Sequence, residues 1–359
     1  MAPPLRRAPT MDDVAAAAGV SKMTVSRALR GAVVAAPTRA RIMEAVSRLG
    51  YVPHAAAGAL ASRRSGFVAA IVPSMDNSNF AETVAGLEAA LRQAGLDLLL
   101  GTTLYSSARE EELLQTLMRH RPEGIVLTGG AHSRRVAALL SRSALPVVET
   151  WDLPASPIGG VVGFSNRAAG AVMTAHLAAI GRRRIAFLGG ASRRDPRGEE
   201  RGRGYEETLA ASGLGPPLVF RHGQPPLSMR HGAEGMARLL ERWPETDAVV
   251  CASDLIAFGA IGECQRRGIA VPERIAIGGF GDFEVSRCAV PAISTVAVDA
   301  RGIGERAGAM LARAVAASRR GEILSPERIE VGLRLVARGS SLHPAHLEHH
   351  PIRWNHLIG

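Results

Sequence analysis

The chain has 359 residues, 47% of them hydrophobic, enough for a small module plus one or two ordinary domains with buried cores. This composition excludes a wholly disordered protein, and no apolar run reaches the roughly 20 residues that a membrane-spanning helix needs. The net charge is +10, and residues 1–66 alone contain ten basic and three acidic side chains, a net charge of +7. Such a concentration of charge at one end is typical of a module that binds nucleic acid.

Arginine supplies nearly all of the positive charge, because Lys22 is the only lysine. A GC-rich genome explains the choice of arginine over lysine, but it does not explain why the charge gathers at one end. Residues 1–10 lead into no apolar segment, so we expect no secretory signal. Cys251, Cys264 and Cys288 are widely spaced, and we interpret them as reduced thiols rather than a metal or redox site. A cytoplasmic protein fits these features.

Residues 10–50 predict three short helices. Thr10 is a suitable N-cap for the first helix, and Gly19 is a natural stop at its end. Ser21 caps the second helix, and the third runs from about residue 36 to 49. A helix, a tight turn with glycine, a second helix and a supporting third helix form the helix-turn-helix arrangement.

Beyond an alanine-rich link at residues 53–64, short apolar segments alternate with amphipathic ones. The predicted strands cover residues 67–72, 96–100, 125–127, 146–148, 185–188, 248–251 and 275–278. The predicted helices cover residues 80–94, 108–119, a segment ending near 143, 168–179, 204–211, 232–242 and 255–267. This alternation is typical of parallel sheets with helices on both faces. Because about 270 residues is long for one such sheet, we expect two similar lobes.

Two stretches of the N-terminal segment carry a family pattern. Residues 14–29 read VAAAAGVSKMTVSRAL, and residues 39–53 read RARIMEAVSRLGYVP. Together they resemble the headpiece of the lactose-repressor (LacI) family, which implies a DNA-binding headpiece at residues 1–52. One departure is Ala35, at the place where the family's third helix usually starts with a serine cap.

In a helix-turn-helix the second helix enters the major groove, and its exposed N-terminal residues reach the base edges. Arg27 can form a bidentate contact with guanine, Lys22 offers a point charge, and Met23 suits a thymine methyl. Thr24 and Ser26 suit phosphate oxygens or support of the helix. The predicted DNA-binding residues of the headpiece are Lys22, Met23, Thr24, Ser26, Arg27 and Arg30. The alternative is a generic amphipathic helix with solvated charges.

Residues 53–65 resemble the family's hinge helix, in which a leucine, here Leu60, inserts into the minor groove. His54 stands where the family usually has asparagine, and Gly58 costs about 1 kcal/mol of helix propensity relative to alanine. We therefore expect the order of the hinge to depend on DNA and on dimerisation. A plain alanine-rich linker is the alternative.

Residues 66–342 resemble the family's two-lobed domain, which is similar to periplasmic binding proteins; matching marks include residues 124–126 and 278–280. Within the family, the chain looks most like the gluconate-utilisation repressors. The resemblance implies an effector that binds between the lobes and weakens operator binding. The predicted effector-binding residues are Asn79, Phe80, His132, Glu149, Trp151, Arg201, Ser253, Asp254 and Asp282.

Two departures from the family bear on the effector. Ser253 replaces the asparagine that many members have, and Gly281 stands where a sugar-binding acid is common, which argues against the usual neutral-sugar pocket. An arginine pairs bidentately with a carboxylate, so Arg201 favours a small acidic sugar derivative of the gluconate type. The alternatives are core or lid packing for Phe80 and Trp151, and a solvated loop charge for Arg201.

A ligand-responsive, DNA-binding repressor explains the basic N-terminus, the hinge and the two lobes together. A transport-type sugar-binding protein explains only the lobes, and an enzyme would need a phosphate loop, a G-x-S-x-G elbow or a metal cluster, none of which the sequence contains. We expect no cofactor and no membrane association. The expected partners are a pseudo-palindromic operator duplex, a small sugar or sugar-acid effector and a second copy of the chain.

Residues 343–359 contain five histidines but no leucine heptad. A metal site needs fixed ligand geometry, which a segment broken by proline does not obviously supply. We therefore predict a flexible tail, and we expect a homodimer rather than a tetramer held by a coiled coil.

Overall fold

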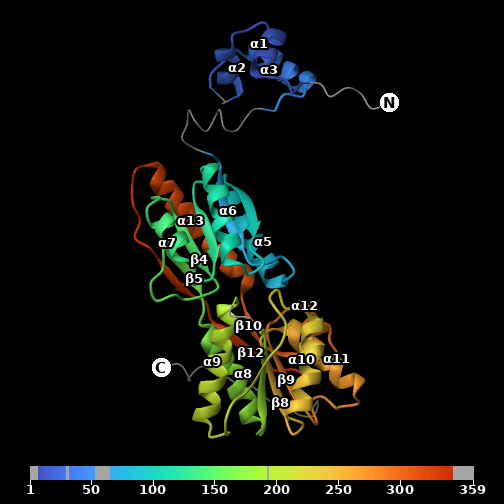
Figure 1. Cartoon of the computed structure of the whole chain (residues 1–359). Coiled ribbons are helices and arrows are strands. Elements are labelled where there is room, and N and C mark those ends of the chain that lie inside the picture. The colour runs from blue at the N-terminus through green and yellow to red at the C-terminus, as the bar shows by residue number, and fades with distance from the viewer. Residues whose placement is uncertain (1–6, 30–31, 53–64, 192–193, 343–359) are drawn as a thin grey trace, which may run out of the picture. The chain divides into compact units, whose positions relative to one another are not determined.

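The structure is a computed structural model, and it describes residues 7–29, 32–52, 65–191 and 194–342. By its internal contacts the chain divides into two compact units, Met1–Gly66 and Phe67–Gly359. Among the described residues, the first unit contains helices α1 to α3 and the second contains two sheets with their helices (Figure 1). The hinge at residues 53–64 and the tail at residues 343–359 lie outside the described residues.

The first unit is a small helical domain. Its helices are α1 (Met11–Ala18), α2 (Lys22–Leu29) and α3 (Ala36–Leu49). Thr10 Oγ1 accepts a hydrogen bond from the Asp13 backbone N–H at 3.4 Å, and the Asp13 carboxylate accepts one from the Thr10 N–H at 2.7 Å. Val14, Val25 and Ile42, one from each helix, are fully buried against one another. The three predicted helices are confirmed.

The second unit begins with a sheet of six parallel strands in the order β11-β5-β4-β3-β1-β2. These strands are β1 (Phe67–Val72), β2 (Asp97–Thr102), β3 (Ile125–Thr128), β4 (Val147–Thr150), β5 (Gly160–Gly163) and β11 (Arg328–Glu330). Helices α5 (Ser78–Gln93) and α13 (Ala300–Arg319) cover one face, and α6 (Ser107–Arg119) and α7 (Arg134–Ser141) cover the other. We call this layered body lobe 1.

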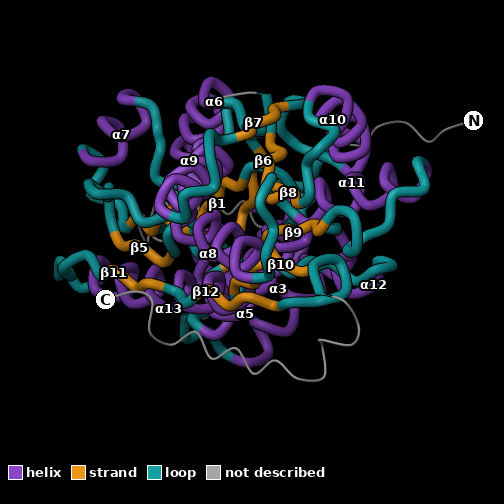
Figure 2. The backbone as a smooth tube through the Cα atoms, turned by 90° about the horizontal axis from the view of Figure 1, so that it is seen from below, coloured by secondary structure: helices purple, strands orange, loops and turns teal. Residues whose placement is uncertain are grey.

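Lobe 2 is built in the same way around the order β12-β10-β9-β8-β6-β7, in which only the β10–β12 pairing is antiparallel. Its strands are β6 (Ile185–Gly189), β7 (Leu218–Arg221), β8 (Ala248–Cys251), β9 (Ala276–Gly281), β10 (Ser294–Val298) and β12 (Leu333–Val336). Its helices are α8 (Asn166–Ala179), α9 (Pro196–Ala211), α10 (Met229–Arg242), α11 (Asp254–Arg266) and α12 (Glu284–Cys288). Helices α8 and α9 lie on one side of the strands and α10 and α11 on the other (Figure 2).

The chain passes between the lobes three times: from β5 to α8, from β10 to α13, and from β11 to β12. The predicted pair of parallel-sheet lobes is therefore confirmed. The apolar and amphipathic patterns did not predict β5, β7, β10, β11, β12, α12 or α13, and they placed the start of α9 at residue 204, eight residues late. Among the described residues, no helix combines the length and the apolar character needed to cross a membrane. The cysteines are free thiols, Cys251 and Cys264 buried and Cys288 exposed.

Candidate functional site

The second helix of the headpiece turns a polar face to solvent. Val25 and Ala28 are buried, whereas Lys22, Met23 and Arg27 are exposed, Met23 to 73%. This division follows from helical spacing, because residues three and four apart share a face. Exposure of these residues is what the predicted DNA contacts require, and the contacts themselves stay a prediction.

Two of the exposed groups already have partners within the headpiece. Lys22 Nζ lies 2.8 Å from an Asp12 carboxylate oxygen, and an Arg27 guanidinium nitrogen donates to the Val33 carbonyl at 3.2 Å. Both contacts are exposed, so each is worth little in water and can be exchanged for a phosphate or a base edge. The predicted contacts of Arg30 and Leu60 fall outside the described residues.

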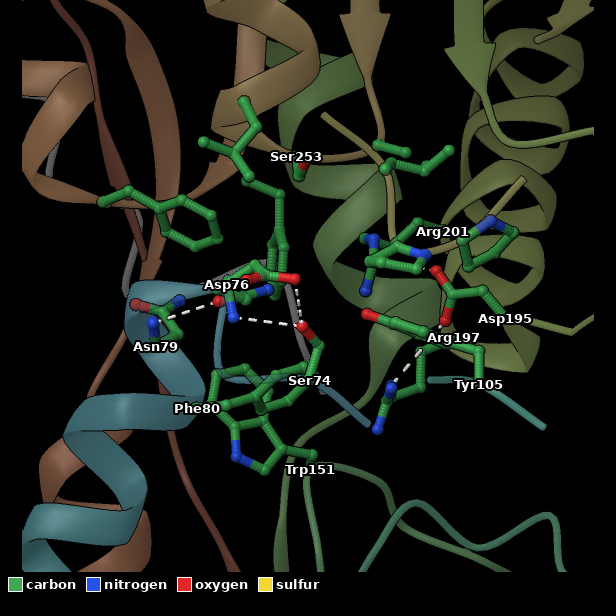
Figure 3. Close-up of a pocket in the computed structure, with 18 residues that line it drawn as sticks. Ser74, Asp76, Asn79, Phe80, Tyr105, Trp151, Asp195, Arg197, Arg201 and Ser253 are labelled. Atoms are coloured by element: carbon green, nitrogen blue, oxygen red, sulfur yellow. Dashed lines mark hydrogen bonds and ion pairs between the residues drawn. The ribbon is translucent and has the colours of Figure 1, made fainter. Parts of the chain in front are cut away.

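Five predicted effector residues meet in one pocket between the lobes, which we call the cleft pocket (Figure 3). They are Asn79, Phe80, Trp151, Arg201 and Ser253. Trp151 and Ser253 follow parallel strands, Asn79 and Phe80 lie in the first turn of α5, and Arg201 lies in the second turn of α9. These positions are at the carboxyl edges of the sheets, where α/β folds bind ligands. Residues from both lobes line this pocket, so a ligand in it would touch both lobes at once.

Arg201 is the most constrained charge in the cleft pocket. Its guanidinium is buried, lies 4.5 Å from the centre of the Phe280 ring, donates to the Asn166 side-chain oxygen and stands 3.7 Å from Asp195. Burial lowers the pKa of Arg201 from its usual value, and the nearby Asp195 carboxylate opposes that effect. Among the described residues, neither Arg201 Nε nor Asp195 Oδ1 has a hydrogen-bond partner. Arg201 Nε is therefore a buried donor without a hydrogen-bond partner, while Asp195 Oδ1 lies 3.8 Å from Arg197 Nε.

Aromatic rings form the floor of the cleft pocket. Trp151 stacks edge-on against Phe80 at 5.1 Å and against Phe164 at 5.6 Å, and Phe164 lies 5.8 Å from Phe280 of lobe 2. The Trp151 indole N–H donates to Thr83 Oγ1 at 3.1 Å, and the Trp151 backbone has a φ of 70°. Backbone strain of this kind in a large residue is typical of ligand sites.

Gly281 has a geometric reason to lack a side chain. Its φ is 124°, and a Cβ there would lie 2.2 Å from the Phe283 ring and 2.9 Å from the Asn79 side-chain nitrogen. Asn79 uses that nitrogen to donate to the Gly281 carbonyl at 2.9 Å, which joins lobe 1 to lobe 2. The family's acid at this position would therefore not fit beside these neighbours without movement.

His132 and Glu149 do not line the cleft pocket, contrary to expectation. His132 Nδ1 lies 2.8 Å from a Glu110 carboxylate oxygen, and His132 Nε2 lies 2.9 Å from the Gly129 carbonyl and 3.6 Å from Glu149. Burial alone would lower the pKa of His132, but the two carboxylates raise it above its usual value. Glu149 also accepts the Ile158 N–H at 2.6 Å. The cluster therefore holds the loops at the end of the sheet, and neither His132 nor Glu149 lines the cleft pocket.

Asp254 and Asp282 also lie outside the pocket lining. Asp254 is fully buried and accepts hydrogen bonds from the Phe283 N–H at 2.8 Å and Thr295 Oγ1 at 2.7 Å. Burial raises the pKa of Asp254 to about 7. Asp282 pairs instead with Arg287 at 2.8 Å and with Arg338. Both acids fix the loop that brings Phe283 into the pocket, so they act on a ligand only through that loop.

Sequence reasoning missed several residues of the pocket lining. These are Ser74, Asp76, Tyr105, Asp195, Arg197 and Phe283, with others of the apolar wall. The Asp-Pro pair at residues 195–196 was a usable signal, because proline favours the first turn of a helix and so brings Arg197 onto α9. No sequence pattern pointed to Tyr105. Its distinguishing feature is a backbone φ of 62°, which is visible only in the structure.

A helix-turn-helix headpiece joined to a two-lobed domain with a pocket between its lobes defines a ligand-responsive, DNA-binding transcription regulator. Known families agree: residues 10–54 match bacterial regulatory proteins of the lacI family, and residues 174–341 match a periplasmic binding protein-like domain. The HTH-type transcriptional regulator GntR of Pseudomonas aeruginosa is 38% identical over 334 residues, 93% of this chain and 96% of the relative. The chain belongs to the lacI family of bacterial regulatory proteins and is a transcriptional repressor of that family.

Solved structures of relatives match the same architecture. A LacI family transcriptional regulator from Silicibacter pomeroyi superposes with a TM-score of 0.84 at 33% identity, covering 92% of this chain and 99% of that one. A second regulator from the same organism has 42% identity and a TM-score of 0.72, covering 77% and 100%. These relatives are transcription regulators rather than enzymes. Among the described residues, no cluster of three side chains is suited to hold a metal ion.

Proposed function

We propose that the chain represses genes for the use of a sugar acid and releases its operator when that acid binds in the cleft pocket. A ligand shifts the lobes only through a difference in affinity between two arrangements. The cleft pocket supports this role because its walls come from both lobes. The effector should favour the arrangement that separates the two hinges of a dimer and so weakens operator binding.

The observation that carries the choice of an acidic effector is the environment of Arg201. A buried guanidinium with an N–H that lacks a hydrogen-bond partner is costly, and a carboxylate would satisfy both its charge and its donor. Arg197 adds a second guanidinium on the same helix face, with only Asp195 between the two. Asp195 and the exposed Asp76 can accept hydrogen bonds from hydroxyl groups of the same ligand.

Gly281 supports the same choice. An acid at this position would place a negative charge beside Asn79 and Phe283, two residues that line the cleft pocket. Without it, the nearest acid on that loop is Asp282, which is already paired with Arg338 and Arg287. The electrostatic repulsion of an anionic effector is therefore weaker in this pocket than in a pocket of the family that carries the acid.

Calorimetry on the full chain tests the effector class. Gluconate and related sugar acids should bind, and neutral hexoses and nucleosides should bind far more weakly. Arg201→Ala should abolish binding and induction while operator binding remains, because the headpiece is untouched. Arg203→Ala is the matched control, since Arg203 lies on the same helix but is exposed and pairs with Glu200. If neutral sugars bind wild type and acids do not, the effector class is wrong even though the repressor function stands.

We also propose a homodimer that works in the cytoplasm without catalysis. One headpiece buries too little surface for tight, specific DNA binding. A dimer with two-fold symmetry binds a pseudo-palindromic operator through two headpieces. Lobe 1 supports dimerisation through its edge strand β2, where Leu99 and Leu100 are 44% and 39% exposed. A long, apolar edge strand is a natural pairing surface for a second copy.

A further inference from the structure

A second pocket adjoins the cleft pocket on the side of lobe 1, and we call it the side pocket. Besides Tyr105 and Arg197, its polar lining residues are Thr103, Ser106, Ser107, Glu110, Thr128, Asp152 and Arg194. The side pocket has a volume of about 420 Å³, within the roughly 300–1,000 Å³ usual for small-molecule sites, whereas the cleft pocket has only about 50 Å³. The cleft pocket alone is therefore too small for a six-carbon sugar acid.

Arg197 and Tyr105 line both pockets and form the partition between them. The Arg197 guanidinium lies 5.3 Å from the centre of the Phe80 ring and 5.9 Å from that of Tyr105. Its other side faces the side pocket, since a Cβ on Gly129 would lie 3.6 Å from it. Figure 3 shows Arg197 and Tyr105 together at one end of the cleft pocket. Both parts of the partition are side chains rather than backbone. A ligand can therefore move the long Arg197 side chain aside by a change of rotamer.

The two pockets also follow neighbouring strands. Thr128 at the end of β3 pairs with Thr150 at the end of β4, and Trp151 of the cleft pocket comes next in the chain. Asp152, one residue further, lines the side pocket. A ligand bound against Trp151 would thus need to extend by only one strand spacing, about 4.8 Å, to reach Thr128.

The side pocket has the chemistry of a polyol site. Its hydroxyl groups both donate and accept hydrogen bonds, Arg194 only donates, and the carboxylates of Asp152 and Glu110 only accept. Sugar hydroxyls need donors and acceptors in this mixture. The two carboxylates balance the charges of Arg194 and Arg197, so the lining favours a neutral polyol chain over a second anion.

We propose that the effector occupies both pockets, with its carboxylate on Arg201 in the cleft pocket and its hydroxylated chain in the side pocket. This inference rests on the proposed sugar-acid effector and adds the residues that read the length of its chain. Arg197 then lies alongside the bound ligand and contacts its middle carbons. Thr128 and Ser107 set the preference for long acids over short ones.

A paired substitution tests this inference on the full chain. Thr128→Val with Ser107→Ala removes two hydroxyl groups from the side pocket and should weaken gluconate about tenfold, the effect of losing two neutral hydrogen bonds. The matched control is Thr102→Val with Ser78→Ala, which alters another strand end and another first helical residue outside both linings. The control should bind gluconate as wild type does. Titration by tryptophan fluorescence measures both, since Trp151 lines the cleft pocket.

The four-carbon acid erythronate separates a length effect from general damage. It is too short to reach the side pocket, so wild type and the paired variant should bind it equally. Unchanged gluconate binding in the paired variant, or an equal loss for both acids, overturns the two-pocket inference and leaves the proposed effector class intact. If wild type binds neither acid, the effector class is wrong and this inference falls with it.

Discussion

Arg27 lies on the exposed face of α2, the helix that we predict reads the operator. Its side chain is exposed on α2 and donates to the Val33 carbonyl at 3.2 Å. A carbonyl is a weaker partner than the two acceptors of a guanine, so operator DNA should capture the guanidinium.

Arg27→Ala should cost about 1–3 kcal/mol of operator binding and relax specificity at one base position in each half-site. A gel-shift series over operator variants measures both effects. Arg39→Ala, which removes an exposed charge from α3, should weaken all sequences alike and leave their ranking unchanged. If Arg27→Ala leaves the ranking unchanged too, α2 is not the reading helix.

Asp254 gives lobe 2 a pH-dependent stability. Burial raises the pKa of its folded form to about 7, above the unfolded value of 3.8, so the folded state binds the extra proton between these limits. Stability should therefore fall as pH rises from about 4 to about 7. Asp254→Asn should flatten this fall while keeping an acceptor for the Phe283 N–H. Urea unfolding of wild type and Asp254→Asn at pH 5 and pH 8 checks this prediction. If the free energy of unfolding changes equally with pH in both proteins, Asp254 is not the group responsible.

Helix α9 shows how one element turns a run of arginines into a site. The helix begins at Pro196, so Arg197 and Arg201 are one turn apart on the same face and both enter the cleft pocket. Arg203 lies two residues further on and points to solvent. Had the helix begun at residue 204, as periodicity predicts, all of these charges would have been loop residues.

The pairing of α8 with α9 depends on one close approach. A Cβ on Gly204 would lie 1.9 Å from the Arg167 carbonyl oxygen, so the two backbones leave no room for a side chain. Gly204→Ala should lower the free energy of unfolding by about 1–3 kcal/mol. Gly262→Ala is the control in α11, where a Cβ meets only the Arg266 side chain at 3.7 Å; it should be neutral or stabilising. Equal effects in chemical denaturation would mean that α8 and α9 separate easily.

At the scale of the whole molecule, the two lobes are joined by three crossings of the chain. Because residues of both lobes line the cleft pocket, a ligand in it can change how the lobes are arranged. The Asn79 bond to the Gly281 carbonyl and the stacked rings from Trp151 to Phe280 join the lobes in the arrangement described here. An effector that fills the cleft pocket has to keep or break these contacts together. Induction is therefore expected to be an all-or-none change of lobe arrangement rather than a local adjustment.

Dimerisation belongs to the same scale. Light scattering at micromolar concentration should give a dimer, and a stable tetramer or a monomer would contradict the proposal. Leu100→Glu on β2 should shift the equilibrium toward monomer, because it places a charge on the apolar edge strand. Leu139→Glu is the control, since Leu139 is similarly exposed, at 37%, but lies on α7.

The sequence alone determined the features that local interactions fix. Caps, glycine stops and helical spacing predict α1, α2 and α3, because each depends on residues within a few positions of one another. Alternating apolar segments predict the two parallel sheets for the same reason. The pocket role of Arg201 was implied by the family resemblance rather than by a local pattern, and its burial beside Asp195 supports that prediction.

Only the tertiary structure decided which polar residues face the ligand. His132 and Glu149 sit at strand ends as predicted, but Glu110 from α6 draws them into a buried cluster, which no local pattern reveals. Tyr105 and Arg197 meet across the cleft although 92 positions separate them in the chain. The exposed, three-residue strand β11 exists only because β5 is there to pair with it. Contacts of this kind are set by packing between distant segments, so a single sequence does not encode them in any local pattern.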